Sequence, residues 1–79
     1  MTGELPEDEA RYQEIADSLR GRIDSGELPA GAMLPSAARI SEEWGVSTTT
    51  AGNALRLLHS ESLIRLEEGG EAFVAGPDD

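Results

Sequence analysis

The stretch that decides the fold runs from Ser36 to Leu58 and reads S-A-A-R-I-S-E-E-W-G-V-S-T-T-T-A-G-N-A-L-R-L-L. Two serines in it stand where a helix would begin, because a hydroxyl at an N-cap accepts a hydrogen bond from an otherwise unpaired backbone N–H. Ser36 should open a helix that ends near Gly45, a residue suited to the left-handed conformation that terminates helices. Ser47 should open the next helix. Two helices separated by only a few residues predict a helix-turn-helix.

Apolar residues recur at three- and four-residue spacing, both within this stretch and upstream of it, which is typical of amphipathic helices. Within the stretch, the predicted buried positions are Ile40, Trp44, Ala51, Ala54, Leu55 and Leu58. Upstream, the stripe of a further helix consists of Tyr12, Ile15, Ala16, Leu19 and Ile23. That helix should end near Gly26, and Met33 and Leu34 should be extended because a residue before proline avoids helical angles.

Downstream of the helix-turn-helix, two short apolar runs flank the turn E-E-G-G, a pattern that predicts a β-hairpin. The runs are Leu63-Ile64-Arg65-Leu66 and Ala72-Phe73-Val74. The predicted fold is therefore mainly α with a small β-hairpin: a winged helix-turn-helix of three helices and a two-stranded wing. Residues 9–75 should form this single domain, flanked by a disordered acidic arm at residues 1–8 and a disordered tail at residues 76–79.

The composition excludes several classes of site. With no cysteine, the chain has no disulfide and no thiolate metal site. His59 is the only histidine, and no nucleophile with an orienting acid is placed to converge on it, so we expect no metal, no other cofactor and no enzyme activity. No apolar run approaches the ~20 residues that span a bilayer, and the acidic N-terminus is unlike a secretory signal. We therefore expect a cytoplasmic protein without membrane contact.

The charge distribution is the most unusual feature of the sequence. Six arginines and no lysine face sixteen acids, which gives a net charge of −10. Residues 1–32 carry eight acids and three arginines, for −5, and residues 61–79 carry six acids and one arginine, again −5. Residues 33–60 carry two of each and are neutral. Most proteins that bind nucleic acid are basic, because neutralising phosphates supplies much of their affinity. Here the helix-turn-helix occupies a neutral middle between two acidic ends.

The sequence resembles the DNA-binding domain of the GntR family over about residues 12–74. The most specific signature is G-E-L-P-A-G…L-P-S, between Gly26 and Ser36, and E-E-W-G-V-S-T-T-T-A-G-N-A-L-R-L-L fits the family's helix-turn-helix in register. The resemblance implies a bacterial transcription regulator that binds operator DNA as a dimer, with the second helix of the motif in the major groove and the wing along the minor groove. Family members usually carry a larger C-terminal domain that binds a metabolite. This sequence has none, so we expect no effector binding of that kind.

The sequence departs from that resemblance at the cations. Ala37 and Ala38 stand where the family typically has Glu-Arg, and Thr48 stands where arginine usually follows the cap serine. Gly52 replaces another basic residue of the second helix, and the wing reads E-E-G-G-E where family wings are usually basic. Gly52 either permits close approach of a phosphate or a partner backbone, or is simply tolerated at a cost of about 1 kcal/mol relative to alanine.

Two functions remain open. The first is a small GntR-like transcription regulator that binds double-stranded operator DNA through the helix-turn-helix, as a homodimer or with a partner chain. Hydroxyls and backbone N–H groups at helix N-termini bind phosphates and reach base edges, and asparagine pairs with adenine. The candidate DNA-binding residues are Ser36, Arg39, Ser47, Thr48, Thr49, Thr50, Asn53 and Arg56. On the alternative interpretation, the serines are caps only, and the threonines and Asn53 are solvated. Arg39 then pairs with Glu42 or Glu43, three or four residues further along its helix, and Arg56 pairs with one of these acids or with Glu61.

The second function is a winged-helix protein-interaction module that has lost DNA binding. Three carboxylates at the wing tip would oppose contact with a phosphate backbone, most strongly at low salt. Such a module would act as an acidic antagonist or co-regulator of a basic DNA-binding protein, through Glu67, Glu68 and Glu71. A simpler interpretation of the same acids is that they keep the domain soluble.

Overall fold

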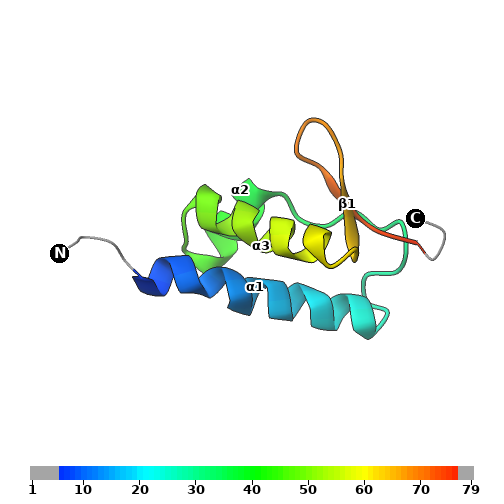
Figure 1. Cartoon of the computed structure of the whole chain (residues 1–79), viewed down its shortest axis with the longest axis horizontal. Helices are drawn as coiled ribbons and strands as arrows, with labels where there is room; N and C mark the ends of the chain where they lie inside the picture. Colours follow the sequence, from blue (N-terminus) through cyan, green and yellow to red (C-terminus); the bar gives the residue numbers. More distant parts are fainter. Residues whose placement is uncertain (1–5, 77–79) are drawn as a thin grey trace.

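The computed structural model describes the backbone of residues 6–76 and the side chains from residue 11 onward, and the structural statements below concern that part of the chain. Three helices precede a two-stranded antiparallel sheet. The elements are α1 (Pro6–Asp24), α2 (Ala37–Trp44), α3 (Thr48–Ser60), β1 (Ile64–Leu66) and β2 (Ala72–Val74). In Figure 1, α1 lies below α3, and the wing formed by β1 and β2 rises on the other side. The predicted winged helix-turn-helix is confirmed.

The helix ends follow the capping residues that the sequence predicts. The Ser36 side chain accepts a hydrogen bond from the backbone N–H of Arg39 at 3.1 Å, and Ser47 accepts one from the backbone N–H of Thr50 at 3.1 Å. Gly45 ends α2 with a φ of 68°, a left-handed conformation that is free of Cβ strain in glycine. Both predicted N-caps and this C-cap are thus confirmed.

The first helix, α1, begins at Pro6, earlier than the sequence predicts. Proline suits the first turn of a helix, where its missing N–H would have no intrahelical partner. Residues 6–8, expected in the disordered arm, are therefore helical. The predictions for residues 1–5 and 77–79 lie outside the described residues, and Gly76 belongs to neither a helix nor a strand.

The core lies where the helices and the base of the wing meet. The predicted stripes are confirmed, because the buried helix residues include Ile15, Ala16 and Leu19 of α1, Ile40 of α2, and Ala51, Ala54, Leu55 and Leu58 of α3. Half-buried at the edge of this cluster are Tyr12, Ile23 and Trp44. The wing adds Ile64, Ala72 and Val74. Burial of these inward side chains holds the hairpin against the helices.

The wing is joined by a third extended segment. β1 and β2 pair antiparallel with Ile64 opposite Val74, and β1 starts one residue later than the predicted run. On the other side of β2, the Val74 N–H donates to the Ala32 carbonyl at 2.8 Å, and the Leu34 N–H donates to the Ala72 carbonyl at 2.8 Å. The sequence predicts the extended backbone of this segment but not its pairing. The loop between α1 and α2 therefore holds the base of the wing next to the helix-turn-helix.

Candidate nucleic-acid interface

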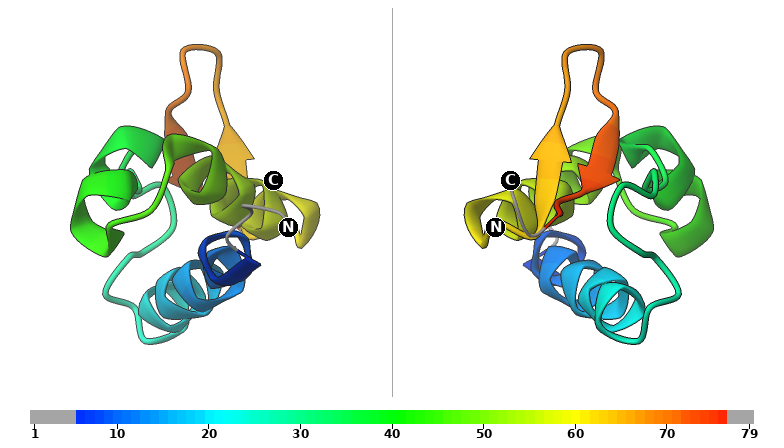
Figure 2. Two further views of the ribbon diagram at one scale, coloured as in Figure 1. Left: turned by 90° about the vertical axis from the view of Figure 1, so that its left-hand side faces the viewer. Right: turned by 90° about the vertical axis from the view of Figure 1, so that its right-hand side faces the viewer.

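The wing and α1 lie on opposite sides of α3, the second helix of the helix-turn-helix. In Figure 1 and in both views of Figure 2, α1 lies on one side of α3 and the wing rises on the other. The first turns of α2 and α3 carry backbone N–H groups without intrahelical partners and the positive ends of the helix dipoles, which attract phosphate. A nucleic acid that approached α3 from the side of the wing would not meet α1.

At the start of α2, Ser36 and Arg39 are exposed, but both have intramolecular partners. The Ser36 hydroxyl caps the helix, and Nε of Arg39 lies 3.6 Å from a carboxylate oxygen of Glu43, one turn further on. Of the two acids expected to pair with Arg39, Glu43 therefore does so. The Arg39 side chain is 68% exposed, and exposed helical ion pairs contribute little free energy. A phosphate can replace Glu43 at small cost.

At the start of α3, the hydroxyls predicted to contact DNA divide into two groups. Thr50 is buried, with 3% of the residue exposed, and its hydroxyl accepts a hydrogen bond from that of Ser47 at 3.1 Å. It lies four residues before Ala54, on the buried side of the helix. Its hydroxyl is therefore turned away from any ligand on the surface, contrary to the expectation from the sequence. Thr48 and Thr49 are exposed and remain candidates.

We call the side of α3 that is not buried its open face. It consists of Thr48, Thr49, Gly52, Asn53 and Arg56. Arg56 is exposed, and Gly52 and Asn53 are half-buried. A Cβ placed on Gly52 would have no atom within 4 Å, apart from its own helix backbone and its chain neighbours. Because residues three and four apart share one face of a helix, the fold brings Thr49, Asn53 and Arg56 together.

Among the arginines, Arg56 is the one that has no ion pair and no side-chain hydrogen bond with another described residue. The ion pairs of the other arginines are Arg11–Glu14 at 3.8 Å, Arg20–Glu61 at 2.9 Å, Arg22–Glu27 at 3.0 Å, Arg39–Glu43 at 3.6 Å and Arg65–Glu67 at 3.1 Å. Hydrogen bonds from Arg20 to Glu61 and to Asp17 raise the pKa of Arg20 above its ordinary value. Within residues 11–76, the guanidinium without an ion pair is thus that of Arg56, on the open face of α3.

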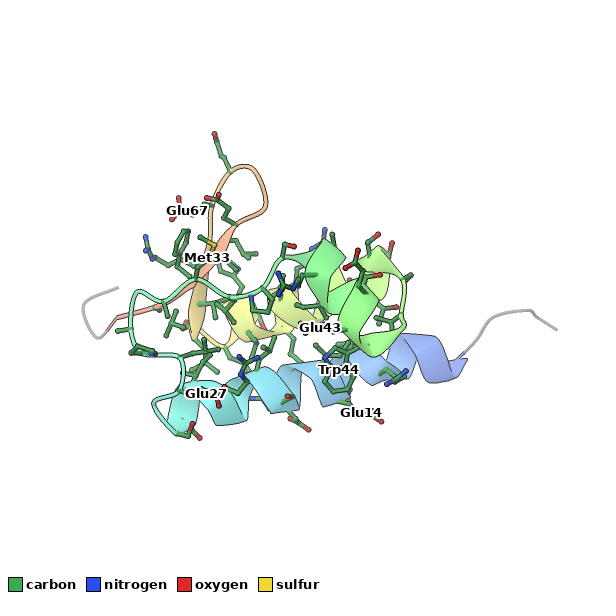
Figure 3. The ribbon with its side chains drawn as sticks, turned by 180° about the vertical axis from the view of Figure 1, so that it is seen from behind. Glu14, Glu27, Met33, Glu43, Trp44 and Glu67 are labelled. Carbon is green, nitrogen blue, oxygen red and sulfur yellow. The ribbon has the colours of Figure 1, made fainter. Side chains whose placement is uncertain are left out.

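The wing tip is acidic, as the sequence predicts. Glu67, Glu68 and Glu71 are all exposed, and Figure 3 shows the Glu67 side chain on the wing. The Glu67 carboxylate lies 3.1 Å from Nη1 of Arg65. The Arg65 guanidinium also lies over the ring of Phe73, its partner across the ladder, at 5.7 Å from the ring centroid. One of the three acids is therefore paired within the wing.

The single tryptophan, Trp44, packs at the edge of the core, which confirms the expected role. The Arg11 guanidinium lies 5.6 Å from the centroid of its indole ring, in a cation–π arrangement. Nη1 of Arg11 also donates a hydrogen bond to the Trp44 carbonyl at 3.1 Å. Figure 3 shows Trp44 at the end of α2 beside α1. Arg11 thus fastens the end of α2 to α1, a role that the sequence does not indicate because the two residues are 33 positions apart.

Among the described residues, no group of three or more His, Cys, Asp and Glu side chains could hold a metal ion. In the same part of the chain, no helix combines the length and the apolar character needed to cross a membrane. His59 is exposed in the last turn of α3. The groups that the open face of α3 offers to a ligand are hydroxyls, an amide and a guanidinium.

Residues 11–74 match the family described as bacterial regulatory proteins, gntR family. The chain is similar to the mannosyl-D-glycerate transport/metabolism system repressor MngR of Escherichia coli, with 36% identity over 63 residues. That match covers 80% of this chain and 26% of the repressor. The chain therefore spans about a quarter of the length of this curated relative.

Two solved structures illustrate the similarity of fold. YtrA from Sulfolobus acidocaldarius, a GntR-family transcription factor, is similar with a TM-score of 0.76 and 31% identity, over 82% of this chain and 55% of YtrA. The DNA-binding domain of AraR in complex with operator ORR3 is similar with a TM-score of 0.78 and 26% identity. That match covers 82% of this chain and 78% of the AraR chain. One of the similar folds has thus been observed on operator DNA.

Proposed function

The chain belongs to the gntR family of bacterial regulatory proteins, and we propose that its winged helix binds double-stranded operator DNA and thereby regulates transcription. In this proposal α3 enters the major groove with its open face toward the bases. The observation that carries the proposal is the position of Arg56. Among the described residues it is the arginine without an intramolecular partner, and it lies on that open face.

An unpaired guanidinium is informative on a protein this acidic. The chain has sixteen acids and six arginines. In the described structure, each of the other five arginines forms an ion pair with a carboxylate. A phosphate provides Arg56 with the partner it lacks, because its oxygens match the planar fork of the guanidinium. The similarity to an operator complex supports the same assignment.

The proposed contacts fall into two classes. Backbone N–H groups at the starts of α2 and α3, together with the cap serines Ser36 and Ser47, position the domain on phosphates and carry no sequence information. Thr48, Thr49 and Asn53 face the bases, where an asparagine amide can both donate to and accept from adenine. Recognition therefore depends on hydroxyl and amide groups more than on charge.

The affinity of one copy should be modest and weakly dependent on salt. Each phosphate neutralised by a cation contributes about −0.9 to the slope of log K against log salt concentration. Arg56, joined by Arg39 after it leaves Glu43, predicts a slope of about −2, against about −5 to −9 for proteins that make six to ten such contacts. We propose that two copies bind one operator, because the contacts of the second copy add to those of the first.

The alternative function, an acidic antagonist of a basic DNA-binding protein, rests on the net charge of −10 and on the replaced cations, and no contact among the described residues adds to them. Glu67 is paired with Arg65 inside the wing, and the similar AraR structure holds operator DNA. We therefore assign the exposed acids Glu68 and Glu71 to solubility.

Selection from a random pool of duplexes tests the proposed function. At low salt the chain should enrich one sequence, and the double variant Thr49→Ala/Arg56→Ala should bind that duplex at least about tenfold more weakly. A matched control is Ser18→Ala/Arg22→Ala, which removes a hydroxyl and an arginine from α1 and should leave affinity nearly unchanged. Retention of no duplex at the lowest salt concentration would refute the proposal.

A further inference from the structure

Gly52, the fifth of the thirteen residues of α3, is an unusual residue for the interior of a helix. Apart from proline, glycine is the least favourable residue in a helix interior, because it loses the most backbone freedom on folding. Chains keep it where the backbone turns left-handed or where another group approaches closely. Gly52 lies inside a regular helix, and a Cβ placed on it would have no atom within 4 Å, apart from its own helix backbone and its chain neighbours. The fold itself therefore does not require this glycine.

The groups proposed to hold DNA flank Gly52 on both sides. Thr48 stands four residues before it and Arg56 four residues after it, so the three positions follow one line along the helix surface. Asn53 stands next to it on the same open face. A ligand held by Thr48 and Arg56 would meet bare backbone between them.

We propose that Gly52 is the point at which α3 approaches the operator most closely, with the edge of a base pair occupying the space of the missing side chain. This inference rests on the proposed DNA binding. A helix without a side chain at the point of contact can lie deeper in the major groove, where its backbone makes van der Waals contact with base edges. Such contact reads sequence without a cation, which suits a domain whose open helix face carries one arginine.

The chain provides a matched control in Gly21. This glycine also lies inside a helix, α1, and a Cβ placed on it would likewise have no atom within 4 Å. Because α1 lies on the side of α3 opposite the wing (Figure 1), a methyl group added at Gly21 would not meet DNA. Gly21→Ala and Gly52→Ala should raise the melting temperature alike, by about 4–8 °C, since alanine is the best helix former.

The affinity for DNA should differ between Gly52→Ala and Gly21→Ala. The probes are the duplex that the unchanged chain selects from a random pool and a scrambled duplex of the same composition. Gly52→Ala should bind the selected duplex about tenfold more weakly and the scrambled duplex almost as before, because base edges differ between sequences whereas phosphates do not. Gly21→Ala should bind both duplexes like the unchanged chain.

Two results would overturn the inference while leaving the proposed function intact. Unchanged binding of the selected duplex by Gly52→Ala would mean that the glycine is merely tolerated. An equal loss on the selected and scrambled duplexes would place the sugar–phosphate backbone, rather than a base edge, at Gly52. If the unchanged chain selects no duplex, the proposed function is refuted and this inference with it.

Discussion

The helices α1 and α3 lie side by side (Figure 1), yet they use their arginines in opposite ways. The three arginines of α1 with described side chains, Arg11, Arg20 and Arg22, each form an ion pair with an acid of the same chain. The arginine of α3, Arg56, has no such partner among the described residues. The number of cations is therefore a poor guide to a phosphate-binding surface. The informative quantity is how many of them are free to meet a phosphate.

The same comparison reduces the conflict between the proposed DNA binding and the net charge of −10, because many of the acids lie on α1. Exposed acids such as Glu14 and Asp17 lie on α1, and α1 lies on the side of α3 opposite the wing. Packed helices lie about 8–10 Å apart from axis to axis, so DNA against the open face of α3 is farther from the outer face of α1 than this spacing. Because the Debye length is about 10 Å at 0.1 M salt, these charges are largely screened from DNA.

The largest expected effect is on stability, and it comes from a substitution in the core that α1 and α3 share. Leu58 is fully buried in one cluster with Ile15 and Leu19 of α1. Leu58→Ala should lower the free energy of unfolding by about 3 kcal/mol, because it removes buried surface and leaves a cavity. Leu57→Ala, at the half-buried neighbouring position, should lower it by about 1 kcal/mol. Urea unfolding followed by the fluorescence of Trp44 measures both, and equal losses would contradict this orientation of α3.

This inward side of α3 was predictable from the sequence because its signals are local. An N-cap serine bonds to a residue three positions further on, and a buried stripe repeats every three or four residues. The burial of Thr50 was predictable too, since it stands four residues before Ala54 and eight before Leu58 on the same line. The sequence nevertheless suggested that Thr50 contacts DNA, because hydroxyls at the start of a helix are also typical of DNA contact.

The contacts that could not be predicted join residues far apart in the sequence. Arg20 bonds to Glu61 across 41 positions, and Arg11 bonds to the Trp44 carbonyl across 33. Neither composition nor periodicity marks these partners. The pairing of the segment before α2 with β2 was missed for the same reason. Arg56 became distinct from the other arginines only when the fold showed which of them were already paired.

A smaller effect, on operator affinity, is expected when one arginine is removed from α3 or from α1. Arg56→Ala should weaken operator binding about tenfold and reduce the salt slope by about one, because one phosphate contact is lost. Arg22→Ala removes the same charge from an arginine paired with Glu27, and should change neither quantity measurably. Fluorescence anisotropy titrations at several salt concentrations measure both. A larger loss from Arg22→Ala than from Arg56→Ala would reverse the assignment of the two helices.

The smallest expected effect concerns acids on the two sides of the molecule. Glu68 is exposed at the wing tip and Asp24 at the end of α1, and an amide at either position removes one negative charge. Glu68→Gln should strengthen operator binding about twofold at low salt, because its carboxylate stands on the DNA side of α3, whereas Asp24→Asn should not. The gain should shrink as the Debye length falls from about 30 Å at 0.01 M salt to about 10 Å at 0.1 M. Equal gains from both variants would mean that repulsion follows net charge alone, and that the position of the wing is irrelevant to binding.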